Sequence, residues 1–213
     1  MAGFKVHFFS GMAAVVSGDV PCECSFPTSS KRESFTVWMK SLLMQKGNGC
    51  TVFNENGEII YRMDNYDTRR SRKIYLMDLR GRVIFTIVKR KLCIFGCWEG
   101  YKSEDPSSNS RDERIWFRVR KQCSMVRKSL YCRVSMLHCK TPRSCYSMEG
   151  FASKLEFSIK SSTGAAVAEV KRKQTASGIY LGDDVLALVV EPLVDHSLIV
   201  ALVAVYGSIC RRM

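Results

Sequence analysis

The residues whose types and spacing suggest chemistry are mainly basic, and they stand at the ends of expected strands. Strand alternation over residues 114–121 places Arg114, Arg118 and Arg120 on one face with Trp116 among them. Guanidinium groups in such a row can bind phosphate groups in a bidentate manner. Two further clusters complete the candidate site for anionic lipid or phosphate: Lys89, Arg90 and Lys91, and Lys171, Arg172 and Lys173. A solvated surface that protects strand edges is the alternative reading.

The cysteines and histidines give weaker signals. Ten cysteines are present without any Cys-x-x-Cys pair, and the densest cluster combines Cys123, Cys132, Cys139 and Cys145 with His138. This spacing matches no usual zinc module, so reduced thiols are expected and neither a metal nor a cofactor is predicted.

Catalysis is not expected. The three histidines, His7, His138 and His196, are far apart along the chain. The sequence has no nucleophile elbow, no phosphate-binding loop, no His-Glu-x-x-His zinc motif and no dinucleotide fingerprint. The residue pattern therefore predicts a non-enzymatic protein.

Composition points to the class of partner. The chain has 213 residues, of which 46% are hydrophobic, and 33 Lys and Arg against 20 Asp and Glu give a net charge of +13. This hydrophobic content suits a folded core and excludes wholesale disorder. The excess of positive charge favours phosphate-rich surfaces, meaning an anionic membrane or nucleic acid.

The elements that must position the basic residues are mostly strands. Residues 1–33 read as a flexible leader, and residues 34–213 as one domain. The turn residues and hydrophobic alternation predict a barrel or a sandwich of short strands. The expected strands are 34–40, 50–53, 58–62, 73–79, 82–91, 92–101, 114–121, 130–137, 154–160, 165–173 and 184–191.

The final segment reads as a helix over about 196–210, with Asp195 as its N-cap. It is apolar on every face, and at roughly 21 Å it is shorter than the roughly 30 Å hydrocarbon core of a membrane. An enclosed helix or a marginal tail anchor would explain such a segment. A barrel of about twelve strands has room for one helix. We therefore expect a mainly β fold, a closed antiparallel barrel of about 12 strands around the hydrophobic C-terminal helix.

Several strings, in order, carry a family resemblance. The chain resembles the plant LURP-one-related proteins, whose domain is similar to the tubby C-terminal domain and to phospholipid scramblases. The matching strings are WMKSL at 38–42, GNGCTVF at 47–53, YRMDNYD at 61–67, LMDL at 76–79, FGCWEGY at 95–101, AEVKRK at 168–173, LGDDVL at 181–186 and VDHSLI at 194–199.

The resemblance implies a barrel threaded by the terminal helix, a link to plant defence signalling and a relation to membrane-tethered transcription factors. Three functions follow: a monomeric peripheral protein on anionic phospholipid that also binds protein partners, a nucleic-acid-binding regulator, or a scramblase-like membrane protein. The first is favoured, because no recognition helix or zinc module for nucleic acid is visible and the cysteine-dense stretch and acidic calcium spacing of scramblases are absent. The expected location is the cytoplasm, at the plasma membrane, with the nucleus as an alternative and secretion not expected.

Overall fold

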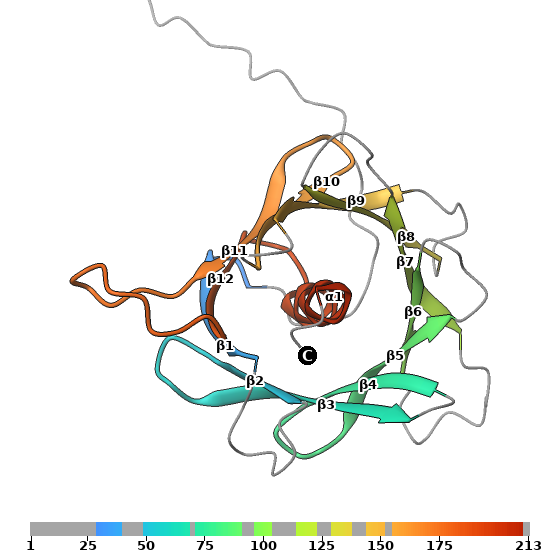
Figure 1. The fold of residues 1–213 in the computed structure, drawn as a ribbon, viewed down its shortest axis with the longest axis horizontal. Coiled ribbons are helices and arrows are strands. Elements are labelled where there is room, and N and C mark those ends of the chain that lie inside the picture. The colour runs from blue at the N-terminus through green and yellow to red at the C-terminus, as the bar shows by residue number, and fades with distance from the viewer. Residues whose placement is uncertain are drawn as a thin grey trace, which may run out of the picture.

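The chain folds into a closed barrel of strands around one helix (Figure 1). This computed structural model describes residues 29–39, 49–68, 71–90, 96–103, 114–122, 129–137, 144–151 and 155–210. The strands are β1 (Glu33–Trp38), β2 (Gly49–Phe53), β3 (Ile59–Thr68), β4 (Ser71–Met77), β5 (Val83–Arg90), β6 (Cys97–Lys102), β7 (Ile115–Gln122), β8 (Leu130–Met136), β9 (Ser144–Phe151), β10 (Glu156–Ser161), β11 (Ala166–Arg172) and β12 (Val185–Val190). The helix is α1 (His196–Ile209).

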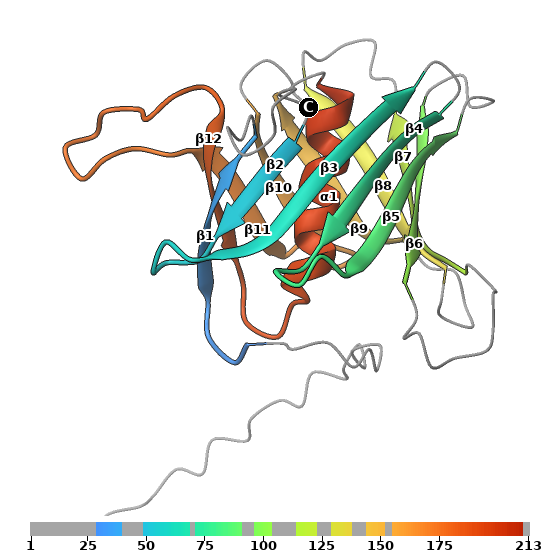
Figure 2. The same cartoon turned by 90° about the horizontal axis from the view of Figure 1, so that it is seen from below.

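Antiparallel pairing of consecutive strands gives the barrel two distinct ends. Each strand pairs with its neighbours in sequence, and β1 pairs with β12 to close the ring. All odd-numbered strands therefore end at the same end of the barrel. Helix α1 ends there too (Figure 2), and we call this end the C-terminal rim. The opposite end, where α1 begins, is the N-terminal rim.

Hydrophobic alternation fills the interior. On β7, Phe117 and Val119 are fully buried, whereas Arg120 is exposed. On β12, Leu186 and Leu188 point inward in the same way. The alternation expected for residues 114–121 is thus confirmed, and so is the expected closed β-barrel.

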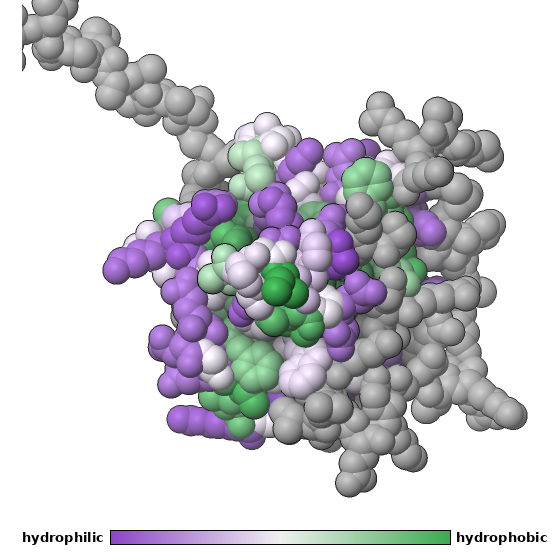
Figure 3. Space-filling view, turned by 60° about the vertical axis from the view of Figure 1, so that its left-hand side comes forward, coloured by the Kyte–Doolittle hydropathy of each residue, from purple (hydrophilic) through white to green (hydrophobic). Residues whose placement is uncertain are grey.

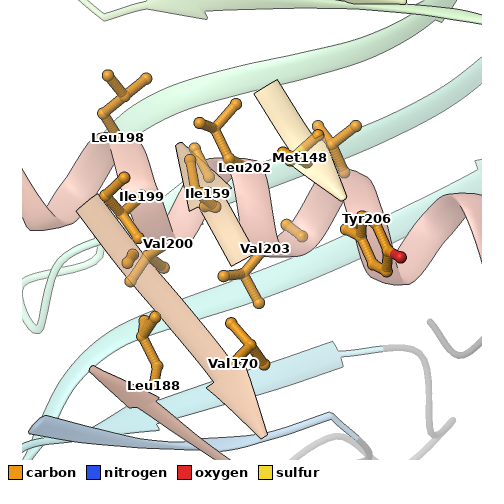
Figure 4. Packing of buried hydrophobic residues seen from close by; sticks show 14 of the residues in the cluster. Met148, Ile159, Val170, Leu188, Leu198, Ile199, Val200, Leu202, Val203 and Tyr206 are labelled. Atoms are coloured by element: carbon orange, nitrogen blue, oxygen red, sulfur yellow. The ribbon is translucent and has the colours of Figure 1, made fainter. Parts of the chain in front are cut away.

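Helix α1 occupies the axis of the barrel. The Asp195 carboxylate caps it by accepting hydrogen bonds from the backbone N–H groups of Ser197 at 2.8 Å and Leu198 at 3.2 Å. Every residue over 197–207 is buried, and Tyr206 stacks on Phe157 with ring centroids 3.8 Å apart. Figure 4 shows helix side chains packed against inward-facing residues of the strands. The predicted cap and the enclosed helix are both confirmed.

No helix in the described part of the chain has the length and apolar character needed to cross a membrane.

Strand β9 is the element that the sequence did not predict. Its residues, SCYSMEGF, mix small and polar types that lack a clear strand pattern. Gly150 is needed for close packing, because a Cβ atom there would lie 2.1 Å from the carbonyl oxygen of Glu156 and 2.4 Å from the Cβ of Phe157. The residue that weakens the strand signal is therefore the one that lets β10 approach β9.

The enclosed helix makes a testable contribution to stability. Leu202 is fully buried, and we expect Leu202→Ala to lower the free energy of unfolding by about 2–5 kcal/mol, because it leaves a cavity inside the barrel. Leu79, which is 66% exposed in the turn after β4, supplies the control. Denaturant unfolding of Leu79→Ala should differ from wild type by less than about 0.5 kcal/mol. Equal effects of the two substitutions would contradict the enclosed-helix core.

Candidate anion-binding surface

The structure divides the predicted basic residues between separate parts of the surface. Lys89 and Arg90 end β5, Arg118 and Arg120 lie on β7, and residues 171–173 end β11, so all three groups lie toward the C-terminal rim. They do not form one patch, since β5 and β11 are six strands apart in a ring of twelve and face opposite ways (Figure 1). Arg114 precedes β7 and lies at the N-terminal rim. Lys91 lies outside the described residues.

A single carboxylate on β6 holds two of the predicted arginines. Glu99, whose side chain is 5% exposed, accepts hydrogen bonds from Arg90 Nε at 2.5 Å and from Arg118 Nε at 3.0 Å. The Tyr101 hydroxyl donates a third, at 3.0 Å. Arg90 and Arg118 are therefore structural partners of Glu99 and are not free to neutralise a ligand.

These contacts also control the ionisation of Glu99. Burial by itself would raise the pKa of the Glu99 carboxyl, but hydrogen bonds from Arg90, Tyr101 and Arg118 outweigh it and hold the pKa below its ordinary value. The carboxylate consequently stays charged and keeps both guanidinium groups in place over the outer face of β6.

The cluster at the end of β11 is also compensated. Arg172 forms ion pairs with Glu156 at 3.5 Å and with Asp183 at 3.3 Å. Lys171 pairs with Glu169 at 2.9 Å. Lys173 donates a hydrogen bond to the Thr36 hydroxyl. This side of the rim offers little net positive charge to a ligand.

Basic side chains without an ion-pair partner in the described part of the chain lie on β7 and β8. Arg120 and Arg133 face each other directly across these two strands, and both are exposed. Lys121 is the next residue and is exposed too, but it pairs with the buried Cys132 and so lies on the opposite side of β7 from Arg120. Within the described residues, neither Arg120 nor Arg133 has a carboxylate partner in an ion pair. We call Arg120 and Arg133 the β7–β8 basic cluster.

The arrangement of this cluster is unfavourable without a ligand. Like charges directly opposite each other across two strands repel and destabilise the pairing. A phosphate group between the two guanidinium groups would reverse the sign of this interaction by accepting hydrogen bonds from both. The sequence analysis found Arg120 but missed Arg133. Alternation along the predicted strand 130–137 would have placed Arg133 on the outer face, but the register against β7 is set by the fold.

Aromatic rings cover part of the remaining basic residues. Lys89 Nζ lies 5.0 Å from the centre of the Trp98 ring, and Lys102 Nζ lies 4.6 Å from that of Trp116. Such cation–π contacts hold a lysine close to the surface of the barrel. The ring expected among the arginines is therefore covered by a lysine from the neighbouring strand.

The cysteines and histidines form no reactive group in the described residues. Burial raises the pKa of the Cys132 thiol to about 12, and so keeps it protonated. Cys123, Cys139 and the side chain of Cys145 lie outside what is described. His196 Nδ1 lies 2.9 Å from the Tyr61 hydroxyl at the start of α1. Over the described ranges, no group of three or more His, Cys, Asp or Glu could hold a metal ion.

Comparison with known proteins gives matches over most of the chain. The LURP-one-related family model matches residues 33–207. Protein LURP-one-related 4 of Arabidopsis thaliana is 44% identical over 85% of this chain and 80% of its own length. Protein LURP-one-related 11 is 43% identical over 85% and 79%, and protein LURP-one-related 3 is 40% identical over 94% and 91%, both from the same plant.

A solved structure agrees with the fold. An X-ray structure of a protein from Arabidopsis thaliana matches with a TM-score of 0.59 at 15% identity, covering 85% of this chain and 93% of that chain. At this identity the likeness shows the fold alone.

The buried carboxylate gives a prediction for stability. We expect Glu99→Gln to lower the free energy of unfolding by about 1–3 kcal/mol, because Arg90 and Arg118 lose their shared counter-charge. Glu149→Gln is the matched control, since Glu149 is 41% exposed and pairs with Lys160 at 3.3 Å. That change should cost less than about 1 kcal/mol. Urea unfolding of the three proteins at pH 7 measures the difference, and a similar loss in both variants would contradict the special role of Glu99.

The difference in stability between wild type and Glu99→Gln should depend on pH in a defined direction. Because the folded-state pKa of Glu99 is lowered, its contribution is complete above the ordinary glutamate pKa of about 4.3. It is lost as the pH falls through the folded-state value. The gap in unfolding free energy between wild type and Glu99→Gln should therefore close on acidification from pH 7 towards pH 3. A gap that stays constant would mean that the carboxylate charge is not its source.

Proposed function

The chain belongs to the LURP-one-related family, and we propose that it is a non-enzymatic protein that attaches reversibly to anionic phospholipid at the C-terminal rim of its barrel. The observation that carries this proposal is the facing pair Arg120 and Arg133, whose charges repel across β7 and β8 and have no described counter-ion. Phosphate groups of a lipid surface are the ligands that such a pair would bind best.

The expected free energy of membrane binding suits reversible attachment. Each Lys or Arg near an anionic leaflet gains about 1 kcal/mol, so the β7–β8 basic cluster supplies a modest share and neighbouring lysines add to it. The net charge of +13 would steer the whole molecule towards such a surface. Binding of this kind weakens with salt and can be released by a change in lipid charge.

The setting we propose is the cytoplasmic face of the plasma membrane, where anionic lipids are concentrated. There the protein, as a monomer, would act in signalling related to plant defence by leaving the membrane or by binding a protein partner. Lipid scrambling is not proposed, because α1 is enclosed by the strands. Nucleic-acid phosphates could meet the same cations, so duplex DNA is an arm of the test.

Co-sedimentation with vesicles tests the proposal at physiological salt, with neutral vesicles compared against vesicles of increasing anionic lipid content. We expect binding only to the anionic vesicles. Arg120→Glu and Arg133→Glu should each weaken it by roughly tenfold or more, since each removes one positive charge and adds a negative one. Arg118→Glu is unsuitable as a test, because it would also remove one of the two arginine partners of the buried Glu99 and place a second carboxylate beside it.

Arg114→Glu is the matched control. It makes the same change in net charge at an exposed arginine of the N-terminal rim, and should leave binding within about twofold. Absence of binding at every anionic lipid fraction would overturn the proposal. Tight, steeply salt-dependent binding to duplex DNA in that case would favour nucleic acid as the partner.

A further inference from the structure

An apolar hairpin projects from the same rim. Residues 173–184 join β11 to β12 and extend away from the barrel (Figure 2). Within it, residues 174–182 contain no charged side chain. Three consecutive residues on its returning arm, after the turn at 176–178, are large, apolar or aromatic, and well exposed: Ile179 at 65%, Tyr180 at 48% and Leu181 at 51%. Figure 3 brings this side forward and shows apolar side chains at the centre of a face, with hydrophilic ones around them.

The tip is ordered and satisfies its own polar groups. The backbone N–H of Thr175 donates to the carbonyl of Ile179 at 2.8 Å, and that of Gly178 donates to the carbonyl of Thr175 at 2.9 Å. The Thr175 and Ser177 hydroxyls lie 2.8 Å apart and share a hydrogen bond. Gly178 permits the turn with a φ of +81°. Polar groups paired in this way reduce the cost of moving the tip out of water.

The acidic residues near the hairpin are held at its base. Asp183 pairs with Arg172, and Asp184 accepts a hydrogen bond from the Trp38 indole at 3.1 Å. The Arg172 guanidinium also lies 3.9 Å from the centre of the Tyr180 ring. Neither carboxylate therefore extends towards the tip, and the Tyr180 ring lies against the Arg172 guanidinium at the charged base.

The chemistry of this arrangement fits the boundary region of a lipid bilayer. Aromatic and aliphatic side chains on a projecting segment, with basic residues behind them, are typical of groups that lie between headgroups and acyl chains. Three side chains cannot supply the roughly 800 Å² per partner that a stable protein interface needs. The hairpin also starts from the rim towards which the β7–β8 basic cluster lies, with two strands, β9 and β10, between β8 and β11. It leaves the barrel on the side away from β7 and β8 (Figure 1), so a membrane that meets both features must lie across the C-terminal rim.

We propose that the apolar arm of the hairpin, Ile179, Tyr180 and Leu181, inserts into the interfacial region of the anionic membrane that the β7–β8 basic cluster contacts. This inference rests on the proposed function and adds a second, apolar source of affinity. The cluster supplies the salt-dependent part of binding, and the hairpin supplies a part that persists at high salt.

The test compares two double variants of the full chain on anionic vesicles over a range of salt. Ile179→Ser/Leu181→Ser should weaken binding by roughly tenfold at high salt and keep the salt slope of wild type. Leu79→Ser/Leu193→Ser is the matched control, because these leucines are 66% and 69% exposed at the N-terminal rim. It should bind as wild type does. Thermal unfolding midpoints close to that of wild type confirm that both variants fold.

A second measurement reports insertion directly. In Tyr180→Trp, we expect a blue-shifted emission on vesicle binding and quenching by lipids brominated on the acyl chains, beyond the signal of the native tryptophans. If wild type binds anionic vesicles but the Ser variant binds equally well and the new tryptophan is not quenched, insertion is refuted while the proposed function stands. If wild type binds no anionic vesicle, both are refuted.

Discussion

The apolar character of α1 on every face is the constraint on which the rest of the structure depends. A helix with no polar side must be surrounded by protein or by lipid. Here twelve strands close around it, and the inward residues of each strand form one continuous core with the helix. Closure also removes the free strand edges that an open sheet of this size would expose. The helix and the barrel therefore stabilise each other, and neither buries its apolar surface alone.

Closure of the barrel leaves its outer face and its two ends as the places where a ligand can bind. The interior is filled, so a ligand must be met on the outer face or at a rim. Antiparallel pairing then collects the ends of all odd-numbered strands at the rim where α1 ends. The basic residues near the ends of β5, β7 and β11 are far apart in sequence, yet this topology brings them to the same end of the molecule. On the outer face, Arg90 and Arg118 are bound to Glu99 and maintain the fold. Arg120 and Arg133 remain available to an anion.

Much of the fold could be predicted from local rules, and the site could be predicted only in part. The inward residues of β7, the cap at Asp195 and the enclosed helix follow from alternation, capping chemistry and segment length, which are all local properties. Strand β9 was missed, because Gly150 serves a contact with β10 that no local pattern encodes. The pairing of Glu99 and the facing of Arg120 and Arg133 depend on the register between strands. Composition shows that the chain is basic, but only register shows which cations have no ion-pair partner among the described residues.

Electrostatic attraction and apolar insertion have complementary limits as means of membrane attachment. A pair of facing cations acts at a distance but is weakened by salt, whereas three apolar side chains act only on contact and are insensitive to salt. A protein that must leave the membrane in response to a signal benefits from having both at moderate strength. Either alone gives weak attachment, and loss of one is enough for release. The rim combines them on a rigid barrel, so the distance between the β7–β8 basic cluster and the hairpin is fixed before binding, and little conformational entropy is lost when the membrane is met.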